Sequence, residues 1–345
     1  MKKDERIVFV GPMGGGSIPT NGASVKNYHI AEKLRNQIKH LVIIDTERWK
    51  RNPFILIKLL FVLLFMPNAK FIFSLNNMSA YRVFSFLYFS HCKRVIYYWV
   101  IGGSISDWIK EGRVLKERYS IVHLFIVEGD SMKMKLNTCG FDNVIVVPNF
   151  KKIEYLPVKQ PHGNQVRFVF LSRINPHKGC DYIFSACKQL SQQYNGLFEV
   201  DFYGEVAEDY TDFYDKIATT PNVSYKGFID LRDAQNYDYL ATYDAMLFPT
   251  FWHGEGFPGI MIDAFIAGLP VIASDWHLNK SIITDGITGI IVPPRDIDSL
   301  ILAMEKCIAR PSLIREMSFE CQRQALKYDT DTVLNNELFH KLGLI

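Results

Sequence analysis

The feature that most constrains the fold is a repeated alternation of short β-branched runs with longer segments of helical periodicity. In the first half of the chain, segments such as 22–36 and 80–91 separate these runs, which lie at 7–10, 41–45, 70–74, 94–100, 121–127 and 144–147. Strands that alternate with helices in this way form a parallel sheet covered on both faces. The first half is therefore expected to be a doubly wound α/β domain.

The rhythm breaks between residues 148 and 164, where Pro157, Pro161 and the pair Gly163-Asn164 are typical of a linker. A second alternation follows, with expected strands at 166–171, 198–203, 245–248 and 271–273 and expected helices at 182–194, 232–242 and after Glu255. At 345 residues the chain is long enough for two cores. We expect two Rossmann-like domains, 1–155 and 156–330, facing a central cleft in which ligands of such folds bind.

Composition narrows the class of protein only a little. The 39 Lys and Arg nearly balance the 36 Asp and Glu, so the overall charge indicates no nucleic-acid partner. The six cysteines include no C-x-x-C pair, and no His stands at zinc-ligand spacing, so we expect free thiols in a reducing compartment. The first apolar run, 7–10, is too short for a signal peptide. These observations predict a cytoplasmic protein.

The most informative single stretch runs from His253 to Asp275. Glu255 lies in a Gly-rich turn before an expected helix at 258–267, with Asp263 about two turns into that helix and Gly268 at its end. The N-terminus of such a helix presents backbone N–H groups to an anion, and a carboxylate just before it can accept hydrogen bonds from sugar hydroxyls. This arrangement predicts a site for a nucleotide sugar.

A second anchor follows the first strand of the second domain. Arg173 and Lys178 occur together in the stretch from Leu171 to Asp181, which reads R-x4-K-G. Arg offers a planar fork for phosphate oxygens and Lys a mobile point charge. Together they can balance the charge of a nucleotide diphosphate leaving group.

Both stretches resemble the donor site of retaining glycosyltransferases of the glycogen-synthase-like family (glycosyltransferase family 4), which have the GT-B fold. The family signature E-x7-E reads E-x7-D here. The resemblance implies that Glu255 contacts the transferred sugar, that Asp263 holds the nucleotide ribose, and that Arg173 and Lys178 serve the diphosphate. The shorter Asp requires a contact rebuilt over about 1.5 Å or mediated by water. Further donor-binding positions implied by the resemblance are Gly22, Gly256, Phe257 and Pro258.

The chain also departs from the family. Many members place a sugar-contacting His after the fourth strand of the first domain, where this chain has Ile101. Ser104 or a backbone group could supply that contact. The run Gly14–Gly16 could approach a phosphate or could be a loop without ligand contact, and it does not fit the dinucleotide motif. The resemblance further implies that a last helix within 331–345 packs back on the first domain.

The expected reaction moves a hexose from a nucleotide diphosphate sugar, of UDP type, to an acceptor hydroxyl with retention of configuration. We expect no metal and no cofactor, because the Asp pairs 296/298 and 329/331 flank helices and do not form a metal site. A nucleotide-sugar epimerase and a noncatalytic partner subunit are the alternatives. Nucleotide release from the donor would distinguish transfer from both.

One segment of the sequence bears on how the acceptor is bound. A basic segment from Arg48 to Arg51 precedes the apolar run 54–66, which is too short to span a bilayer. The run is either a buried helix or a helix resting on a membrane, with Lys58 reaching toward the headgroups. By analogy, the acceptor would be a saccharide or a lipid-linked saccharide in cell-surface polysaccharide assembly, such as capsule or lipopolysaccharide, at the inner face of the cytoplasmic membrane.

Overall fold

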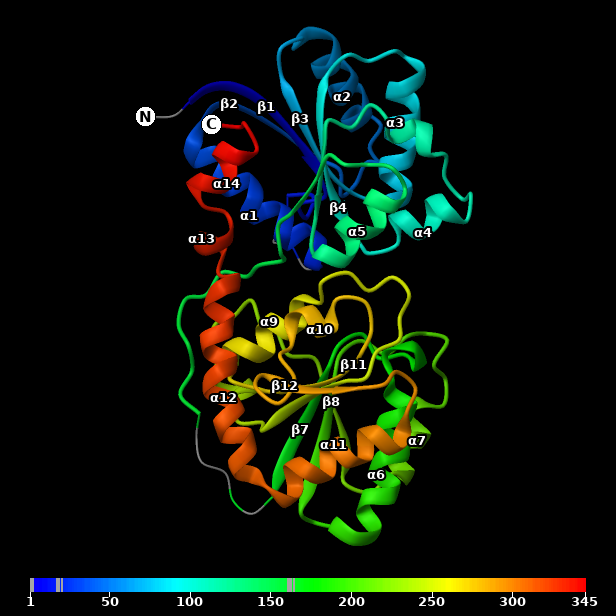
Figure 1. Ribbon diagram of the computed structural model, residues 1–345, viewed down its shortest axis with the longest axis vertical. Helices are drawn as coiled ribbons and strands as arrows, with labels where there is room; N and C mark the ends of the chain where they lie inside the picture. The colour runs from blue at the N-terminus through cyan, green and yellow to red at the C-terminus, as the bar shows by residue number, and fades with distance from the viewer. Residues whose placement is uncertain (1–2, 17–18, 20, 160–162, 164) are drawn as a thin grey trace. The chain divides into compact units, whose positions relative to one another are not determined.

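The chain folds into two compact units (Figure 1). Unit 1 comprises Met1–Phe150 and Thr330–Ile345, and unit 2 comprises Lys151–Asp329. The boundary therefore lies a few residues before the expected one at 155. The computed structural model describes residues 3–16, 19, 21–159, 163 and 165–345. Pro161 and Asn164, which contributed to the linker prediction, lie outside the described residues.

Among the described residues, unit 1 is built on a six-stranded parallel sheet in the order β2-β1-β3-β4-β5-β6. The strands are β1 Lys3–Gly11, β2 Ile38–Asp45, β3 Lys70–Asn76, β4 Val95–Ile101, β5 Leu124–Val127 and β6 Val144–Val146. The helices of this unit are α1 Gly22–Gln37, α2 Phe54–Phe65, α3 Asn77–Phe89, α4 Ile105–Lys110, η1 Lys116–Tyr119, α5 Asp130–Thr138, α13 Thr330–Val333 and α14 Asn336–Lys341. The order of strands reverses between β1 and β3.

In the described part of unit 2, a second six-stranded parallel sheet has the order β12-β11-β10-β7-β8-β9. The strands are β7 Val166–Leu171, β8 Phe198–Tyr203, β9 Val223–Gly227, β10 Ala245–Phe248, β11 Val271–Ser274 and β12 Gly289–Val292. Its helices are η2 Pro176–Lys178, α6 Cys180–Tyr194, α7 Phe213–Thr219, α8 Asn236–Leu240, α9 Gly259–Ile266, α10 Asn279–Ile282, α11 Ile297–Ala309, α12 Pro311–Ala325 and η3 Leu326–Tyr328. This is the strand order of a Rossmann fold, and its switch point lies between β7 and β10.

Aromatic side chains tie helix α6 to the sheet of unit 2. The ring of Phe202 on β8 lies 5.0 Å from that of Phe170 on β7 and 5.1 Å from that of Phe184 on α6. All three side chains are buried in one apolar cluster. Alternate residues of a strand point to the same face, so β7 and β8 present a continuous apolar surface to the helix. This packing holds the sheet on which the loops of the switch point stand.

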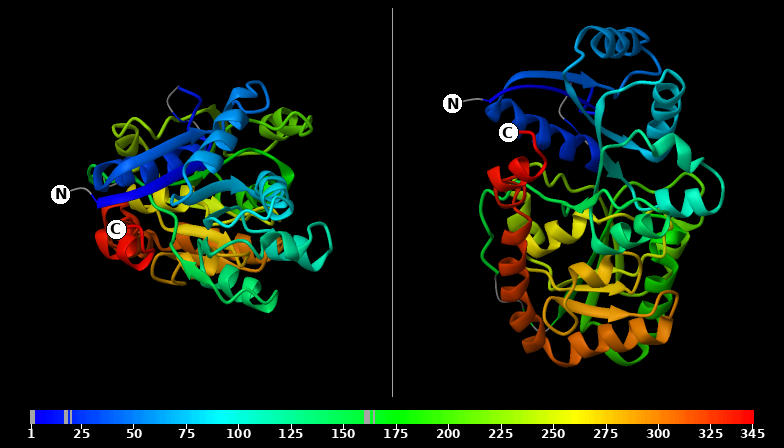
Figure 2. Two further views of the ribbon diagram at one scale, coloured as in Figure 1. Left: turned by 90° about the horizontal axis from the view of Figure 1, so that it is seen from above. Right: turned by 45° about the horizontal axis from the view of Figure 1, so that its top comes forward.

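The C-terminal residues Thr330–Ile345 complete the core of unit 1. Their apolar side chains share a buried cluster with strand β1 and helix α1, and the segment (red) lies beside α1 (blue) in Figures 1 and 2. The contributing residues are Leu334, Phe339, Leu342 and Leu344. The expectation of one helix was wrong, because Asn335 interrupts it. Its side chain accepts a hydrogen bond from the backbone N–H of Leu338 at 2.9 Å and starts α14 anew.

Helix α2 is not a fully buried helix, which was one of the two alternatives for this run. Its inner stripe is buried, whereas nearly all of its outer positions carry exposed apolar side chains: Phe54, Leu56, Ile57, Leu60, Phe61, Leu64 and Phe65. Lys58 Nζ donates to the carbonyl oxygen of Ile43, 3.1 Å away, and the headgroup contact expected for Lys58 stays a prediction.

Other boundaries also differ from the expectations. The helix expected at 232–242 is limited to α8. Asp263 lies about one turn into α9, not two, because the helix begins at Gly259. Elements β9, β12 and α12 were not expected from the sequence, and for α11 only a start near Asp296 was expected.

Candidate functional site

The candidate site is formed by two loops at the switch point of the unit 2 sheet. One loop follows β7 and carries Arg173 and Lys178, and the other follows β10 and carries Glu255. Strands β7 and β10 pair directly, so their carboxyl ends bring the two loops together. Ligands of doubly wound sheets bind outside the carboxyl ends of the strands at such a point.

Gly179 allows the close approach of these loops. Its φ of +84° lies in the left-handed region, and a Cβ there would lie 2.3 Å from the carbonyl oxygen of Pro249. Only Gly fits both demands. The backbone N–H of Phe251 also donates to the carbonyl of His177 at 2.9 Å and links the loops a second time. The Gly of the R-x4-K-G pattern therefore has a packing reason as well as a family resemblance.

Lys178 and Glu255 form an ion pair. Lys178 Nζ donates to Glu255 Oε2 at 2.6 Å, and the hydroxyl of Thr250 donates to the same oxygen at 3.1 Å. The ammonium also lies 5.6 Å from the ring centre of Phe248 at the end of β10. Glu255 is only 9% exposed. The structure thus brings together two of the side chains that the sequence selected, a cation and a carboxylate on adjacent loops.

The residues after Glu255 lead directly into α9. Phe257 is buried and packs edge-on against Tyr328, with ring centres 5.3 Å apart. Pro258 stands at the N-cap in an extended conformation, and no side chain caps the helix there. The first turn of α9 contains no acidic residue, so its backbone N–H groups keep the partial positive charge that attracts an anion. Gly256 lies between these elements and Glu255.

Arg173 and His177 are exposed on the loop after β7. An exposed guanidinium at this edge can turn toward a phosphate at little cost, whereas Lys178 is already held by Glu255. An ammonium has three donors, so Lys178 can bind a phosphate oxygen and keep Glu255. Arg173 and Lys178 are thus held differently, although the sequence pattern predicts the same role for both.

Asp263 belongs to a separate buried network. The hydroxyl of Tyr237 donates to its Oδ1 at 2.5 Å, and Lys151 Nζ lies 3.0 Å from its Oδ2. Asp263 is 3% exposed, so its carboxylate does not face the solvent. Burial, and then the neighbouring Asp263 charge, raise the pKa of Tyr237 well above its ordinary value. A carboxylate accepts about four hydrogen bonds, so a ribose hydroxyl can still donate to Asp263 beside these partners.

The candidate residues of unit 1 are Gly22, the Gly14–Gly16 run, and Ile101 with the nearby Ser104. Gly22 is the first residue of α1, and a Cβ there would meet nothing within 4 Å. In the Gly14–Gly16 run, the N–H of Gly15 donates to Asp45 Oδ2 at 2.7 Å, so a protein carboxylate already occupies this donor. Ile101 ends β4, and the oxygen of Ser104 accepts from the Asn77 side chain at 3.1 Å.

Sequence reasoning missed a buried ion pair in unit 1. Lys26 Nζ on α1 donates to Glu128 Oε1 at 2.7 Å, and the ammonium lies 5.6 Å from the ring centre of Trp99. Both charged side chains are less than a tenth exposed. Glu128 directly follows β5, and a charged residue at the end of an apolar strand was the signal that could have identified it.

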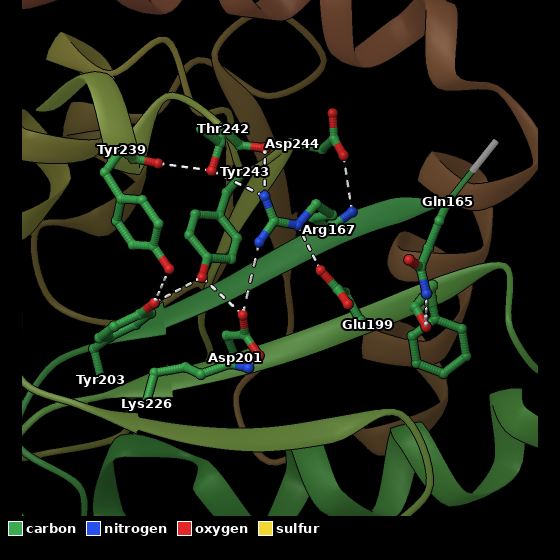
Figure 3. A network of polar contacts seen from close by, with 11 residues as sticks. Gln165, Arg167, Glu199, Asp201, Tyr203, Lys226, Tyr239, Thr242, Tyr243 and Asp244 are labelled. Carbon is green, nitrogen blue, oxygen red and sulfur yellow. Dashed lines mark hydrogen bonds and ion pairs between the residues drawn. The ribbon is translucent and has the colours of Figure 1, made fainter. Parts of the chain in front are cut away.

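A further polar network, shown in Figure 3, lies on the sheet of unit 2. Asp201 accepts from the hydroxyl of Tyr243 at 2.7 Å, and Arg167 also bonds to Glu199. Burial is the largest cause of the raised pKa of Tyr243. Arg167 stands near the start of β7, about 13 Å along the strand from its carboxyl end. The network stabilises the sheet, and through the Tyr243 hydroxyl, 2.8 Å from that of Tyr203, it extends to the carboxyl end of β8.

Within the described ranges, no group of three or more His, Cys, Asp or Glu side chains could hold a metal ion. Asp296 instead caps α11, and its side chain accepts from the N–H of Ser299 at 3.0 Å. This N-cap bond is the largest cause of the lowered pKa of Asp296. All six cysteines are free thiols.

Comparisons with known proteins agree with this geometry. Residues 165–310 match the family described as "Glycosyl transferases group 1". A Klebsiella pneumoniae relative, "Uncharacterized 41.2 kDa protein in cps region", is 24% identical over 253 residues, which are 70% of this chain. The alignment spans 65% of that relative's own length.

Two solved structures share the fold over nearly the whole chain. HepE of Anabaena in complex with UDP superposes with a TM-score of 0.77 at 15% identity, covering 99% of this chain and 100% of that one. The lipopolysaccharide outer core galactosyltransferase WaaB, in its apo form, superposes with a TM-score of 0.67 at 14% identity, covering 99% and 100%. The expected fold is confirmed: two Rossmann-like α/β units of the GT-B type. The family match covers less than half of the chain, and the two solved structures show its fold.

Proposed function

We propose that the chain is a retaining hexosyltransferase of glycosyltransferase family 4, with a UDP-sugar as its donor. The observation that carries the proposal is the Lys178–Glu255 pair on adjacent loops of the unit 2 switch point. The match of residues 165–310 to a glycosyltransferase family supports it. The uridine base is proposed because the structural neighbour HepE was solved with UDP and with UDP-glucose.

In the proposed reaction, the bond between the anomeric carbon and the leaving phosphate oxygen breaks. The acceptor oxygen forms a new bond on the same face of the sugar, and its proton passes to the departing phosphate. Arg173 and Lys178 balance the charge that grows on the diphosphate, and Glu255 orients the sugar by accepting from its hydroxyls. The N-terminal turn of α9, with Gly256, Phe257 and Pro258 before it, favours the anionic part of the donor.

The remaining donor contacts are proposed from the resemblance. Asp263 accepts from a ribose hydroxyl while Tyr237 and Lys151 hold its carboxylate in place. Gly22 at the start of α1 leaves open space in which a donor or acceptor group can approach the backbone. The reaction needs no metal in this scheme, because the two cations carry the leaving-group charge.

The proposed acceptor is a saccharide or a lipid-linked saccharide of cell-surface polysaccharide assembly. The position of the Klebsiella relative in a cps region supports this pathway. The proposed place of the reaction is the cytoplasm, at the inner face of the cytoplasmic membrane. There a lipid-linked acceptor and a nucleotide sugar meet.

The test is a donor screen. The protein is mixed separately with UDP-, GDP- and ADP-sugars, with and without EDTA, and release of the free nucleotide is measured. Slow hydrolysis of at least one donor is expected, with EDTA leaving the rate unchanged. NMR of the product formed with an acceptor then gives the anomeric configuration.

Each other outcome has a distinct meaning. A changed sugar that is still attached to its nucleotide would identify an epimerase. Absence of any turnover, with donor binding also absent by calorimetry, would favour a noncatalytic subunit. Inversion at the anomeric carbon, or loss of activity in EDTA with rescue by Mg²⁺ or Mn²⁺, would overturn the mechanism.

A further inference from the structure

The outer face of helix α2 is apolar where a helix in water should be polar. All exposed positions along it except Lys58 carry Phe or aliphatic side chains, with Phe61 58% and Leu64 65% exposed. Helix α6 of unit 2 shows the usual pattern, because its exposed positions carry only polar side chains: Lys188, Gln189, Gln192 and Gln193. A large exposed apolar face indicates an interaction surface.

Helix α3 extends this face. Its exposed positions follow a helical stripe: Met78, Arg82, Phe86 and Phe89. A groove of about 440 Å³ lies between α2 and α3, which lie side by side in unit 1. Apolar side chains of both helices line the groove, and Trp49, Lys50 and Arg82 stand among them. The surface therefore combines aliphatic and aromatic groups with an indole and two cations.

The sequence segment that carries this surface contains basic but no acidic side chains. From Arg48 to Ser106 the sequence contains no Asp or Glu, although the whole chain has nearly as many acidic as basic residues. The same segment contains eight cations: Arg48, Lys50, Arg51, Lys58, Lys70, Arg82, Lys93 and Arg94. At the edge, the guanidinium of Arg118 lies 4.1 Å from the ring centre of Phe89, and the exposed Glu117 stands beside it in η1. An apolar face within a purely basic segment is complementary to an anionic, hydrocarbon-bearing partner.

We propose that the α2–α3 face of unit 1, formed by the exposed side chains of α2 and α3 with Trp49 and Lys50, docks on an anionic phospholipid bilayer. Helix α2 lies along the interface with its apolar side chains among the acyl chains, and Lys50 and Arg82 contact the headgroups. Trp49 stands at the depth that indoles prefer. The inference rests on the proposed function in one respect: that function explains why the protein would need a membrane.

A second copy of the chain fits this face less well. A symmetric dimer through α2 would bring the basic segments of both copies together, and like charges repel. Among the residues that the structure describes, no helix is long and apolar enough to cross a membrane. The proposed attachment is therefore one of lying on the bilayer through α2 and α3.

The test is flotation of the purified protein with vesicles of phosphatidylcholine alone or mixed with phosphatidylglycerol, at low and high salt. The wild type should float with the anionic vesicles at low salt and less at high salt. The double change Phe61→Glu, Leu64→Glu should lower binding at least tenfold. Its matched control, Leu302→Glu with Phe319→Glu on unit 2 helices of similar exposure (63% and 70%), should bind as the wild type does.

A second pair of variants tests how much the basic side chains contribute to vesicle binding. Each cation near an anionic surface contributes about a fivefold factor in partitioning. Lys50→Gln with Arg82→Gln should thus weaken binding by roughly 25-fold at low salt. Lys188→Gln with Lys306→Gln removes the same charge from exposed helix positions of unit 2 and should have little effect.

Three outcomes would overturn the proposal. They are wild-type protein left unbound at low salt, equal flotation of the Phe61/Leu64 variant, and equal binding to neutral and anionic vesicles. A dimer by sedimentation that this variant dissociates, without any lipid binding, would assign the face to a second copy instead. Nucleotide release from the donor is measured separately on the same variants, so failure of docking and failure of the proposed chemistry remain distinguishable.

Discussion

At the scale of single residues, the Lys178–Glu255 contact makes the sharpest prediction. Glu255→Gln keeps the shape of the side chain but removes its charge and replaces one acceptor oxygen by an NH2 donor, so the sugar loses its charged partner while the diphosphate keeps both cations. Transfer should fall roughly 100-fold or more, and the affinity for UDP should change little. Calorimetry with UDP and a nucleotide-release assay measure the two effects. Glu208→Gln, an exposed change in the same unit, is the control. Near wild-type turnover of Glu255→Gln would remove Glu255 from the mechanism.

Substitutions of Asp263 test whether this residue has the ribose-binding role of the second acidic residue in the family signature. Asp263→Ala leaves the buried hydroxyl of Tyr237 and the ammonium of Lys151 without their acceptor. We expect a loss of about 1–3 kcal/mol in the free energy of unfolding together with weaker UDP binding. Asp263→Glu restores the usual residue of the signature and should retain more UDP affinity. Equal UDP affinities of the two variants would leave Asp263 a structural residue.

The sequence could predict which residues gather at the switch point but not how they are held. Lys178 and Glu255 lie far apart in the chain, and only the pairing of β7 with β10 brings them together. The contacts of Asp263 were missed because Tyr237 and Lys151 come from segments without a motif. A local pattern can specify the type of side chain at a strand end. It does not specify the partner that another loop supplies.

At the scale of elements, the turn between η2 and α6 depends on Gly179. Gly179→Ala would force a Cβ against the Pro249 carbonyl in a left-handed conformation. The expected loss is at least about 2 kcal/mol in the free energy of unfolding of unit 2, with weaker UDP binding as the two loops separate. Gly196→Ala is the matched control, because it has φ +77° and open space around its Cβ. It should cost only about 1 kcal/mol. Similar losses in the two variants would contradict the role of close approach.

Helix α6 buries Cys187 on its inner face, and burial raises the pKa of this thiol well above its ordinary value of 9.0. The folded state therefore keeps a proton that the unfolded chain releases above about pH 9. This contribution to stability is complete below that pH and declines as the pH rises, by about 1.4 kcal/mol between pH 8 and pH 10.

Cys187→Ala and Cys187→Ser should both show a smaller loss of stability over this range than the wild type. Denaturant unfolding at the two pH values measures it. The two variants differ in stability at neutral pH, because Ser buries a hydroxyl, but their change with pH should be alike. A wild-type pH dependence in both would show that this thiol does not titrate on unfolding.

The central strands were predictable because buried parallel strands read as β-branched and aromatic runs. Strand β9 was missed, since Val223–Gly227 is half-buried at the sheet edge and includes Lys226 and Gly227. The outer face of α2 shows a different limit. An apolar run is compatible with burial or with exposure, and only the packed structure decides between them.

At the scale of the whole molecule, unit 1 is discontinuous in sequence. Residues Met1–Phe150 supply the sheet, and Thr330–Ile345 return from the far end of the chain to finish the same core. No local pattern in the last residues indicates this return, and only the family resemblance implied it. Four buried apolar side chains from so short a segment make unit 1 dependent on the C-terminus.

A substitution at Phe339 tests how strongly the stability of unit 1 depends on the C-terminal residues. Its ring is fully buried among side chains of α1 and the sheet of unit 1. Phe339→Ala should cost about 3–5 kcal/mol in the free energy of unfolding of unit 1. Unit 2 has its own core, so a thermal scan should show a transition of unit 1 moved to lower temperature and a second transition left in place. Glu337→Ala, an exposed change on the same helix, is the control. Limited proteolysis followed by mass spectrometry identifies which unit opens first. If Phe339→Ala shifted both transitions equally, the two units would unfold as one cooperative body, and the return of the chain would stabilise the whole protein and not unit 1 alone.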